Sequence, residues 1–225
     1  MGYAAENGIK LLAFDIDGTL YPKSAMNRRL VISSLLHLPF ALKYNSMRRQ
    51  IRNETGFSVP PEDNLEAFQI RQAEILGKSL DWFQKKEDAV FRKPWDKLFS
   101  SIKPYSGLRE VLEEAKEDGY MLAALSDFPL FHKLEALGVD DLFDYSASCE
   151  DYGALKPSAA PFLRMLKELQ ISPAEALYTG DSRSKDIDGA KNAGMHTALI
   201  SRSVRAYDNA DIIFRDWKEF GKMVL

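Results

Sequence analysis

The chain has 225 residues, of which 45% are hydrophobic, enough for one large domain or for one domain that carries an insertion. Its formal net charge of -3 lacks the basic excess expected of a general nucleic-acid binder, and a single cysteine, Cys149, excludes an internal disulfide framework. No apolar run approaches the ~20 residues that a membrane span requires, and no signal peptide is evident. We therefore expect a cytoplasmic protein without nucleic-acid or membrane partners, either a monomer or a homodimer.

The first predicted element is a buried parallel strand over residues 9–14, a mostly apolar run that ends at two carboxylates and a glycine. Between residues 23 and 103, charged and amide side chains alternate with apolar ones, and no strand-like run stands out. Three segments there have helical spacing, namely residues 24–44, 63–77 and 79–92. We therefore predict a helical insertion at 23–103, with a core domain formed by residues 1–22 and 104–225.

After Pro104, strands and helices of similar length alternate. Ser106 is expected to cap a helix that runs to about Asp118 and that Gly119 ends. Further helices are predicted near residues 130–137, 158–170, 185–193 and 217–224. The predicted strands cover residues 120–125, 143–147, 175–179, 195–200 and 211–214. This alternation predicts an α/β fold in which a doubly wound parallel sheet has helices on both faces.

Polar residues gather at four predicted strand ends or in the loops after them, where open parallel sheets bind ligands. They are Asp15, Asp17, Ser126, Lys156, Asp181 and Asp186. Carboxylates gathered in this way raise one another's pKa unless a cation lies among them. Asp15, Asp181 and Asp186 offer hard oxygen ligands that suit Mg²⁺.

The same set fits phosphoryl transfer, which needs an in-line nucleophile and neutralisation of the phosphoryl oxygens. A carboxylate such as Asp15 can be that nucleophile and form an aspartyl-phosphate. Asp17 is placed to protonate the leaving group and later to activate water. Lys156 offers a compact positive charge, Ser126 offers a hydroxyl, and Gly18 permits a tight turn whose backbone N–H groups can face an anion.

In order and spacing, these residues resemble the four motifs of the haloacid dehalogenase superfamily of phosphohydrolases. The first motif, Asp-x-Asp-x-Thr, is matched by residues 15–19, and the second, a hydrophobic strand ending in Ser or Thr, by residues 122–126. The third, a Lys often followed by Pro, is matched by residues 156–157. The fourth, Gly-Asp-Ser-x-x-x-Asp with a later Ala-Gly, is matched by residues 180–186 and 193–194.

The resemblance implies a Rossmann-like core with a helical cap at residues 23–103 that closes over the substrate. It also implies that Asp15 is the nucleophile, that Asp17 is the general acid and base, and that Lys156 steadies both Asp15 and the transferred phosphate. The metal site would be formed by Asp15, Asp17 through its backbone carbonyl, Asp181 and Asp186.

The phosphate pocket implied by the resemblance contains Thr19, Ser126, Asp127 and Lys156. Many relatives carry Asn where this chain has Asp127, and a carboxylate there would disfavour anion binding if it pointed inward. Asp17 disfavours dehalogenation, because the true dehalogenases lack a carboxylate at that position.

The leading function is therefore Mg²⁺-dependent hydrolysis of a small phosphate ester. Tyr21-Pro22 is similar to members that include pyrimidine 5′-nucleotidases, so a nucleotidase is one candidate. The same branch includes phosphoglycolate phosphatase-like and β-phosphoglucomutase-like enzymes. A sugar-phosphate phosphomutase and a non-catalytic module that binds a phosphate ligand are the alternatives.

Simpler interpretations remain for several residues. Ser126 could merely cap the next helix, and Lys156 could lie in a solvated loop. A basic cluster is expected to form a solvated helix face, although it could bind phosphate groups or a membrane surface: Arg28, Arg29, Arg48, Arg49 and Arg52. Core packing is favoured over a membrane-surface helix at 30–42, and over nucleobase stacking for four aromatic residues: Trp82, Phe83, Phe91 and Trp95.

Overall fold

The computed structural model describes residues 2–24, 37–56, 58, 64–94, 99, 102–130, 132–203 and 205–225. Its centre is a six-stranded sheet in the order β3-β2-β1-β4-β5-β6, in which neighbouring strands run parallel. The strands are β1 (Leu11–Phe14), β2 (Met121–Ser126), β3 (Tyr145–Ser148), β4 (Ala176–Gly180), β5 (His196–Ile200) and β6 (Ile212–Phe214). The strand order reverses between β1 and β4, which is where open α/β sheets bind their ligands.

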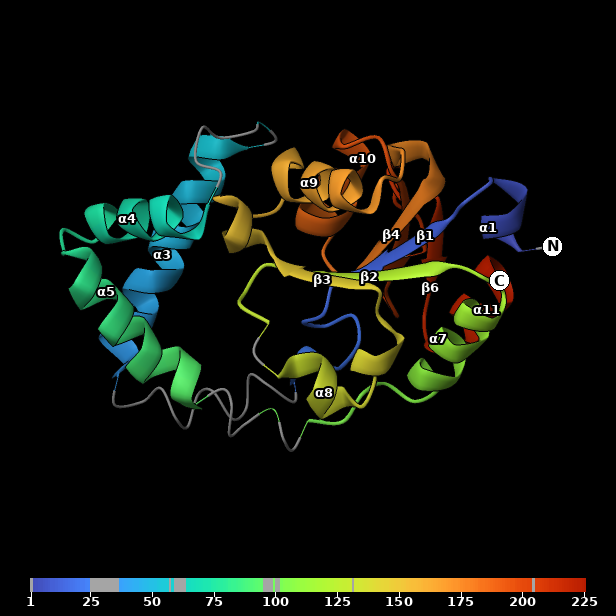
Figure 1. Cartoon of the computed structure of the whole chain (residues 1–225), viewed down its shortest axis with the longest axis horizontal. Helices are drawn as coiled ribbons and strands as arrows, with labels where there is room; N and C mark the ends of the chain where they lie inside the picture. The colour runs from blue at the N-terminus through green and yellow to red at the C-terminus, as the bar shows by residue number, and fades with distance from the viewer. Residues whose placement is uncertain are drawn as a thin grey trace.

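Helices cover both faces of this sheet, α9 and α10 on one side and α7, α8 and α11 on the other (Figure 1). The helices of this part are α1 (Tyr3–Glu6), α7 (Leu108–Glu117), α8 (Lys133–Leu137), α9 (Ala159–Leu169), α10 (Asp188–Asn192) and α11 (Trp217–Val224). Short helical turns are η3 (Asp140–Leu142), η4 (Cys149–Tyr152), η5 (Pro173–Glu175) and the π-helix η6 (Arg183–Ile187). The α/β fold class predicted from the sequence is confirmed.

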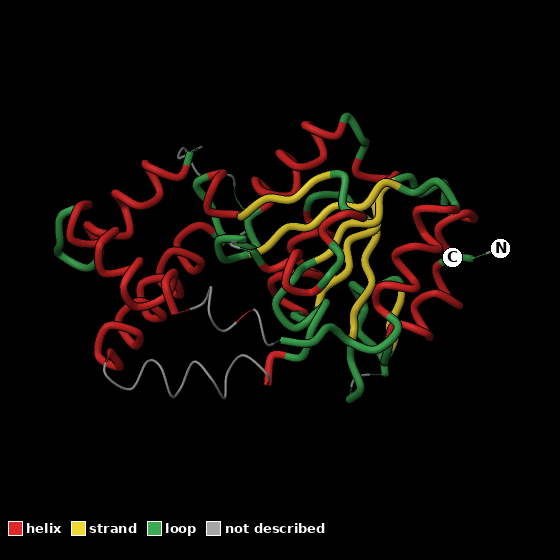
Figure 2. Tube along the Cα trace, turned by 60° about the horizontal axis from the view of Figure 1, so that its bottom comes forward, coloured by secondary structure: helices red, strands yellow, loops and turns green. Residues whose placement is uncertain are grey.

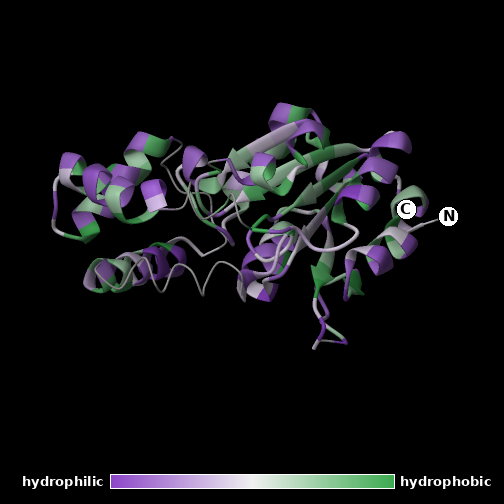
Figure 3. Cartoon of the chain, turned by 90° about the horizontal axis from the view of Figure 1, so that it is seen from below, coloured by the Kyte–Doolittle hydropathy of each residue, from purple (hydrophilic) through white to green (hydrophobic). Residues whose placement is uncertain are grey.

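The central strand β1 is buried on both faces, which explains its continuous apolar sequence. Because side chains alternate along a strand, Leu11 and Ala13 pack on the α9 side, while Leu12 and Phe14 pack on the opposite side. The Phe14 ring lies 5.5 Å from the Trp217 ring of α11. Figure 3 shows the resulting pattern, with apolar residues concentrated along the strands and polar residues on the outer turns of the helices. This packing fixes where β1 ends and therefore where Asp15 lies.

The helices within the described residues 37–94 lie beyond one end of the sheet (Figures 1 and 2). They are α3 (Leu38–Thr55), α4 (Leu65–Ile75), α5 (Leu80–Glu87) and the π-helix η2 (Asp88–Arg92). They enclose an apolar cluster of their own, in which Phe68 and Phe83 are fully buried, and Leu155 of the sheet-containing part joins it. The domain boundaries at 22/23 and 103/104 stay a prediction.

Two predicted helix limits are wrong. Residues 25–36 of the segment predicted at 24–44 lie outside the described residues, but α3 continues well past residue 44. Pro39 does not interrupt the helix, because it lies in the first turn, where proline is tolerated. No other glycine or proline occurs before Gly56, which caps the C-terminal end. Ser106 does not cap α7, whose N-cap is Gly107 without a side-chain hydrogen bond.

The basic cluster is not the solvated face that was expected. Arg48 is only 1% exposed and Arg52 is half-buried, whereas Arg49 is exposed; Arg28 and Arg29 lie outside the described residues. Among the aromatic residues, Phe83 and Phe91 join the apolar cluster of the inserted helices as expected. Trp82 stays 37% exposed, and Trp95 lies outside the described residues.

Of the segment 30–42, the structure describes only the last six residues, in which Phe40 is buried while Leu38 and Leu42 are exposed. Among the helices that the structure describes, none combines the length and the apolar character needed to cross a membrane.

Candidate active site

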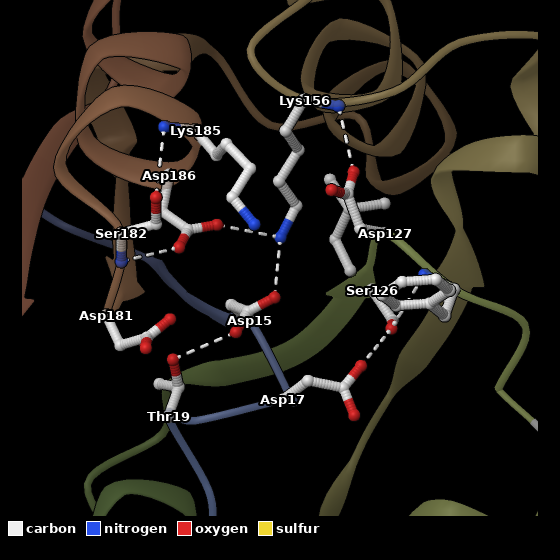
Figure 4. A network of polar contacts seen from close by, with 12 residues as sticks. Asp15, Asp17, Thr19, Ser126, Asp127, Lys156, Asp181, Ser182, Lys185 and Asp186 are labelled. Atoms are coloured by element: carbon white, nitrogen blue, oxygen red, sulfur yellow. Dashed lines mark hydrogen bonds and ion pairs between the residues drawn. The ribbon is translucent and has the colours of Figure 1, made fainter. Parts of the chain in front are cut away.

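The polar residues predicted at the strand ends come together at the carboxyl edge of the sheet (Figure 4). Asp15 follows β1, Ser126 is the last residue of β2, and Asp181 follows β4. Lys156 lies in the loop between η4 and α9, and the peptide bond to Pro157 is cis. Parallel strands bring all of these positions to one edge, as the sequence pattern predicted.

Asp15 is held from both sides. Lys156 Nζ donates to Asp15 Oδ1 at 2.8 Å and to Asp186 Oδ1 at 3.0 Å, and Thr19 Oγ1 donates to Asp15 Oδ2 at 3.0 Å. Lys156 is 1% exposed, so it is not a solvated loop residue. Burial alone would lower the pKa of Lys156, but the neighbouring Asp15 and Asp186 outweigh it and keep the pKa above its ordinary range. The ammonium group is therefore a permanent positive charge between two carboxylates.

Asp15, Asp181 and Asp186 form an acidic cluster, in which one oxygen atom from each carboxylate lies within 4.8 Å of the other two. Burial raises the pKa of Asp15, and the charges of Asp186 and Asp17 add to this effect against the opposing charge of Lys156. Burial also raises the pKa of Asp181, although Lys23 Nζ lies 2.6 Å from Asp181 Oδ2. Crowded carboxylates whose ionised forms are disfavoured fit a bound divalent cation, and their hard oxygen ligands fit Mg²⁺.

The side chain of Asp17 points away from this cluster, toward β2 and α8 (Figure 4). Its Oδ2 accepts a hydrogen bond from Ser126 Oγ at 3.1 Å and forms an ion pair with Lys133 Nζ at 2.7 Å. Its Oδ1 accepts a hydrogen bond from the Tyr21 hydroxyl. Burial would raise the pKa of Asp17, but Lys133 and these hydrogen bonds lower it. Ser126 does not cap α8, which begins at Lys133.

Asp127 does not point its carboxylate freely into the pocket. Oδ2 pairs with Arg52 Nη2 of α3 at 2.7 Å, and Oδ1 accepts from the backbone N–H of Lys156 at 2.9 Å. Burial would raise the pKa of Asp127, but Arg52 and the nearby lysines hold it well below its ordinary range. Asp127 is therefore an ionised carboxylate whose two oxygens are both engaged.

The fourth motif folds as a tight turn into η6. Ser182 donates its backbone N–H to Asp186 Oδ2 at 2.9 Å, and the Lys185 side chain points into the same site (Figure 4). At the first motif, Gly18 has φ +109°, and a Cβ atom there would lie 2.6 Å from Asp181 Oδ2. Glycine is thus required both for the backbone conformation and for the approach to the acidic cluster.

Sequence reasoning missed two cations that the fold brings to the site, Lys23 and Lys133, and it placed Arg52 only in a basic cluster that was expected to be solvated. Of these residues, only Lys133 had a sequence feature that could have indicated burial. It begins a short helical segment in which Leu134 and Leu137 are apolar. Lys133 is itself completely buried. Cys149 is also buried.

Comparison with known proteins agrees with the four motifs. Residues 9–194 match the family described as haloacid dehalogenase-like hydrolase. A glyceraldehyde 3-phosphate phosphatase of Methanopyrus kandleri is 30% identical over 207 residues, which cover 86% of this chain and 84% of that protein. A phosphoglycolate phosphatase of Mannheimia succiniciproducens is 28% identical over 239 residues, covering 96% and 98%.

Among solved structures, a HAD phosphatase from Thermococcus onnurineus superposes with a TM-score of 0.62 and 25% identity, covering 96% of this chain and 97% of that one. These matches confirm the family, the fold and the enzyme class predicted from the sequence, a phosphoric monoester hydrolase.

Proposed function

Because this chain belongs to the haloacid dehalogenase-like hydrolases, we propose that it is a Mg²⁺-dependent phosphatase that acts on a small phosphorylated metabolite through an aspartyl-phosphate. One observation carries the proposal: the buried ammonium of Lys156 lies between Asp15 and Asp186, beside an acidic cluster completed by Asp181. Such an arrangement offers a nucleophile, a fixed positive charge for the phosphoryl oxygens and a metal site within one small space.

In the first step, an oxygen of Asp15 forms a bond to phosphorus while the bond from phosphorus to the ester oxygen breaks. Asp17 is paired with Lys133 in this structure and its pKa is lowered, so it must leave that ion pair and take up a proton before this step. It would then give the proton to the departing oxygen, so that the alcohol leaves neutral. In the second step, water attacks the phosphorus of the aspartyl-phosphate and passes a proton to Asp17. Inorganic phosphate is released, and Asp15 returns to its carboxylate form.

The phosphoryl group would be contacted by Thr19, Ser126 and Lys156. Thr19 and Lys156 already hydrogen-bond to Asp15, so they can orient the nucleophile and then bind the group transferred to it. Both oxygens of Asp127 are engaged with Arg52 and with a backbone N–H, so its carboxylate would border the phosphate pocket without entering it.

Mg²⁺ would be held by Asp15, Asp181 and Asp186, together with the backbone carbonyl of Asp17. When bound, the ion neutralises negative charge on the phosphoryl oxygens and on the carboxylates around it. Lys23 now pairs with Asp181, so we expect this ammonium to give way when a divalent cation binds.

The inserted helices α3, α4 and α5, within residues 23–103, would be the cap that selects the leaving group. Relatives named as acting on glyceraldehyde 3-phosphate and phosphoglycolate support a small, soluble phosphate ester as substrate. A nucleoside monophosphate is a second candidate. With such a substrate we expect neither nucleic-acid nor membrane partners, a cytoplasmic location, and a monomer or homodimer.

The test is a panel of metabolite phosphates assayed for released phosphate with Mg²⁺, with Asp15→Asn as the matched variant. We expect hydrolysis by the wild type and none by Asp15→Asn, because the amide cannot accept the phosphoryl group. A wild type that releases no phosphate across the panel would refute the proposal. Isomerised sugar phosphate without free phosphate would indicate a phosphomutase, and tight phosphate binding without turnover would indicate a binding module.

A further inference from the structure

Helix α3 presents two arginine side chains to the strand-end loops of the sheet, Arg48 and Arg52. They are spaced four residues apart, so they lie on one face of the helix. Each arginine reaches a loop that follows a strand of the sheet. Among the described members of the basic cluster, Arg48 is buried and Arg52 is half-buried, and the proposed chemistry assigns neither of them a direct role.

Arg48 anchors the helix to the sheet. Its Nη2 donates to the backbone carbonyl of Asp127 at 2.6 Å, its Nη1 pairs with the buried carboxylate of Glu150, and its guanidinium lies 4.3 Å from the centre of the Phe128 ring. A fully buried arginine with these partners holds α3 in one place relative to the ends of β2 and β3.

Arg52, one helical turn after Arg48, hydrogen-bonds to the backbone of Lys156. Its Nε donates to the Lys156 carbonyl oxygen at 3.1 Å, and its Nη2 donates to Asp127 Oδ2 at 2.7 Å. The other oxygen of Asp127 accepts from the Lys156 backbone N–H at 2.9 Å. The three residues thus form a closed ring of hydrogen bonds that uses both polar backbone groups of Lys156.

The far end of the same lysine lies in the candidate active site, 2.8 Å from Asp15 Oδ1. Because Lys156 is buried, a displacement of its backbone changes where this ammonium group can lie relative to the nucleophile. We propose that Arg52 is a positioning residue: through Asp127 and the Lys156 carbonyl, it makes the placement of the Lys156 ammonium depend on the docking of the inserted helices. This inference rests on the proposed function, since Lys156 is the group that it positions.

A contact between Arg52 and the substrate is the competing interpretation, because its side chain is 21% exposed. The two roles differ in kinetics. A residue that binds substrate in the ground state changes mainly KM, whereas a residue that aligns a group needed in the transition state changes mainly kcat.

The variants for the test are Arg52→Met, Arg52→Lys, Asp127→Asn and the double variant Arg52→Met/Asp127→Asn. Arg49→Met is the matched control, since Arg49 is exposed on the same helix. We expect Arg52→Met to lower kcat by about 10–100-fold, as for a displacement on the order of 1 Å. KM should stay within about twofold of the wild type in the double variant, which leaves no unpaired carboxylate beside the pocket. Arg52→Lys should lower kcat as Arg52→Met does, because an ammonium group cannot replace the planar guanidinium, which donates to the Lys156 carbonyl and to Asp127 at the same time.

Asp127→Asn keeps a side-chain oxygen for the Lys156 N–H but loses the ion pair, so its effect should be smaller than that of Arg52→Met. The double variant should be no worse than Arg52→Met within about twofold, because the two residues act through one ring. It also removes the unpaired carboxylate, which keeps the comparison valid if Arg52→Met alone folds poorly. Arg49→Met should match the wild type.

Crystal structures of the wild type and of Arg52→Met give a readout that does not depend on turnover. We expect the contact between Lys156 Nζ and Asp15 to be lost or lengthened in the variant. A variant in which this contact is intact, or in which KM rises while kcat is unchanged, would overturn the inference while leaving the proposed function in place. Conversely, a wild type inactive on every phosphate ester refutes the proposed function, and the crystal structures still decide whether Arg52 positions Lys156.

Discussion

Glu87, at the end of α5, should make the stability of the protein depend on pH near neutrality. Glu87 is 5% exposed, and its carboxylate accepts a hydrogen bond from Tyr44 at 2.8 Å. Burial, and then the charge of Glu150, raise the pKa of Glu87 from 4.5 to about 7. The folded protein therefore binds more protons than the unfolded chain between these two values, so its stability falls as the pH rises through that window. At 1.36 kcal/mol per pKa unit, the full loss is about 3 kcal/mol.

Glu87→Gln tests this reasoning, because a neutral amide of the same shape imitates the protonated acid at every pH. Urea unfolding of wild type and variant should be compared at pH 5 and pH 8. We expect the variant to be more stable by about 1 kcal/mol at pH 5 and by about 3 kcal/mol at pH 8. A stability difference that is the same at both values of pH would show that Glu87 titrates alike in the folded and unfolded states, and the reasoning would be refuted.

Three further predictions concern the ion pair at the helix α3 contact, the first motif and the metal. Arg48→Met should lower the free energy of unfolding in urea by about 3–5 kcal/mol, because the buried Glu150 loses its partner; Arg48→Met/Glu150→Gln should recover part of that loss. Gly18→Ala should raise the Mg²⁺ concentration needed for half-maximal activity, because φ is +109° and the new Cβ would approach Asp181 Oδ2 to 2.6 Å; an unchanged Mg²⁺ titration would count against this. Dialysis against EDTA should abolish phosphate release and added Mg²⁺ should restore it, whereas activity that survives dialysis would contradict a role for the acidic cluster.

Much of the candidate site could be predicted from the sequence because its residues follow buried strands directly. Asp15 comes after a strand with four fully buried residues, and Ser126 and Asp181 end or follow strands of the same parallel sheet. Parallel strands bring their carboxyl ends to one edge, so a linear pattern of polar residues at strand ends becomes a cluster in space. The loop that carries Lys156 was recognised by its motif, and its position next to Asp15 follows from the same geometry.

The partners of these residues could not be predicted in the same way. Lys133 pairs with Asp17 across 116 residues of sequence, and Arg52 pairs with Asp127 across 75. A lysine or arginine that is solvated and one that forms a buried ion pair look the same in a local pattern. Only the packing of α8 and α3 against the sheet distinguishes them.

For Arg48 a signal was present in the sequence. The buried apolar residues of α3 follow helical spacing along one stripe: Phe40, Tyr44, Met47 and Ile51. Arg48 lies four residues after Tyr44 and beside Met47, within that stripe and not opposite it. A charged residue inside an apolar stripe is costly unless it is paired, so its position predicts a buried partner even though the sequence does not identify Glu150 as that partner.

The ring around Lys156 also bears on why this chain can carry Asp127 at a position where the family resemblance leads us to expect Asn. A lone carboxylate next to a phosphate pocket would repel the substrate, but Asp127 is paired with Arg52 and its two oxygens point to Arg52 and to a backbone N–H. The pair adds no net charge beside the proposed phosphate pocket, and it hydrogen-bonds to the backbone of the lysine that binds Asp15. The effects of substituting Arg52 and Asp127 should therefore not be independent. Loss of Arg52 alone leaves an unpaired anion beside the pocket, whereas loss of both side chains removes that anion and also the hydrogen bonds to the Lys156 backbone.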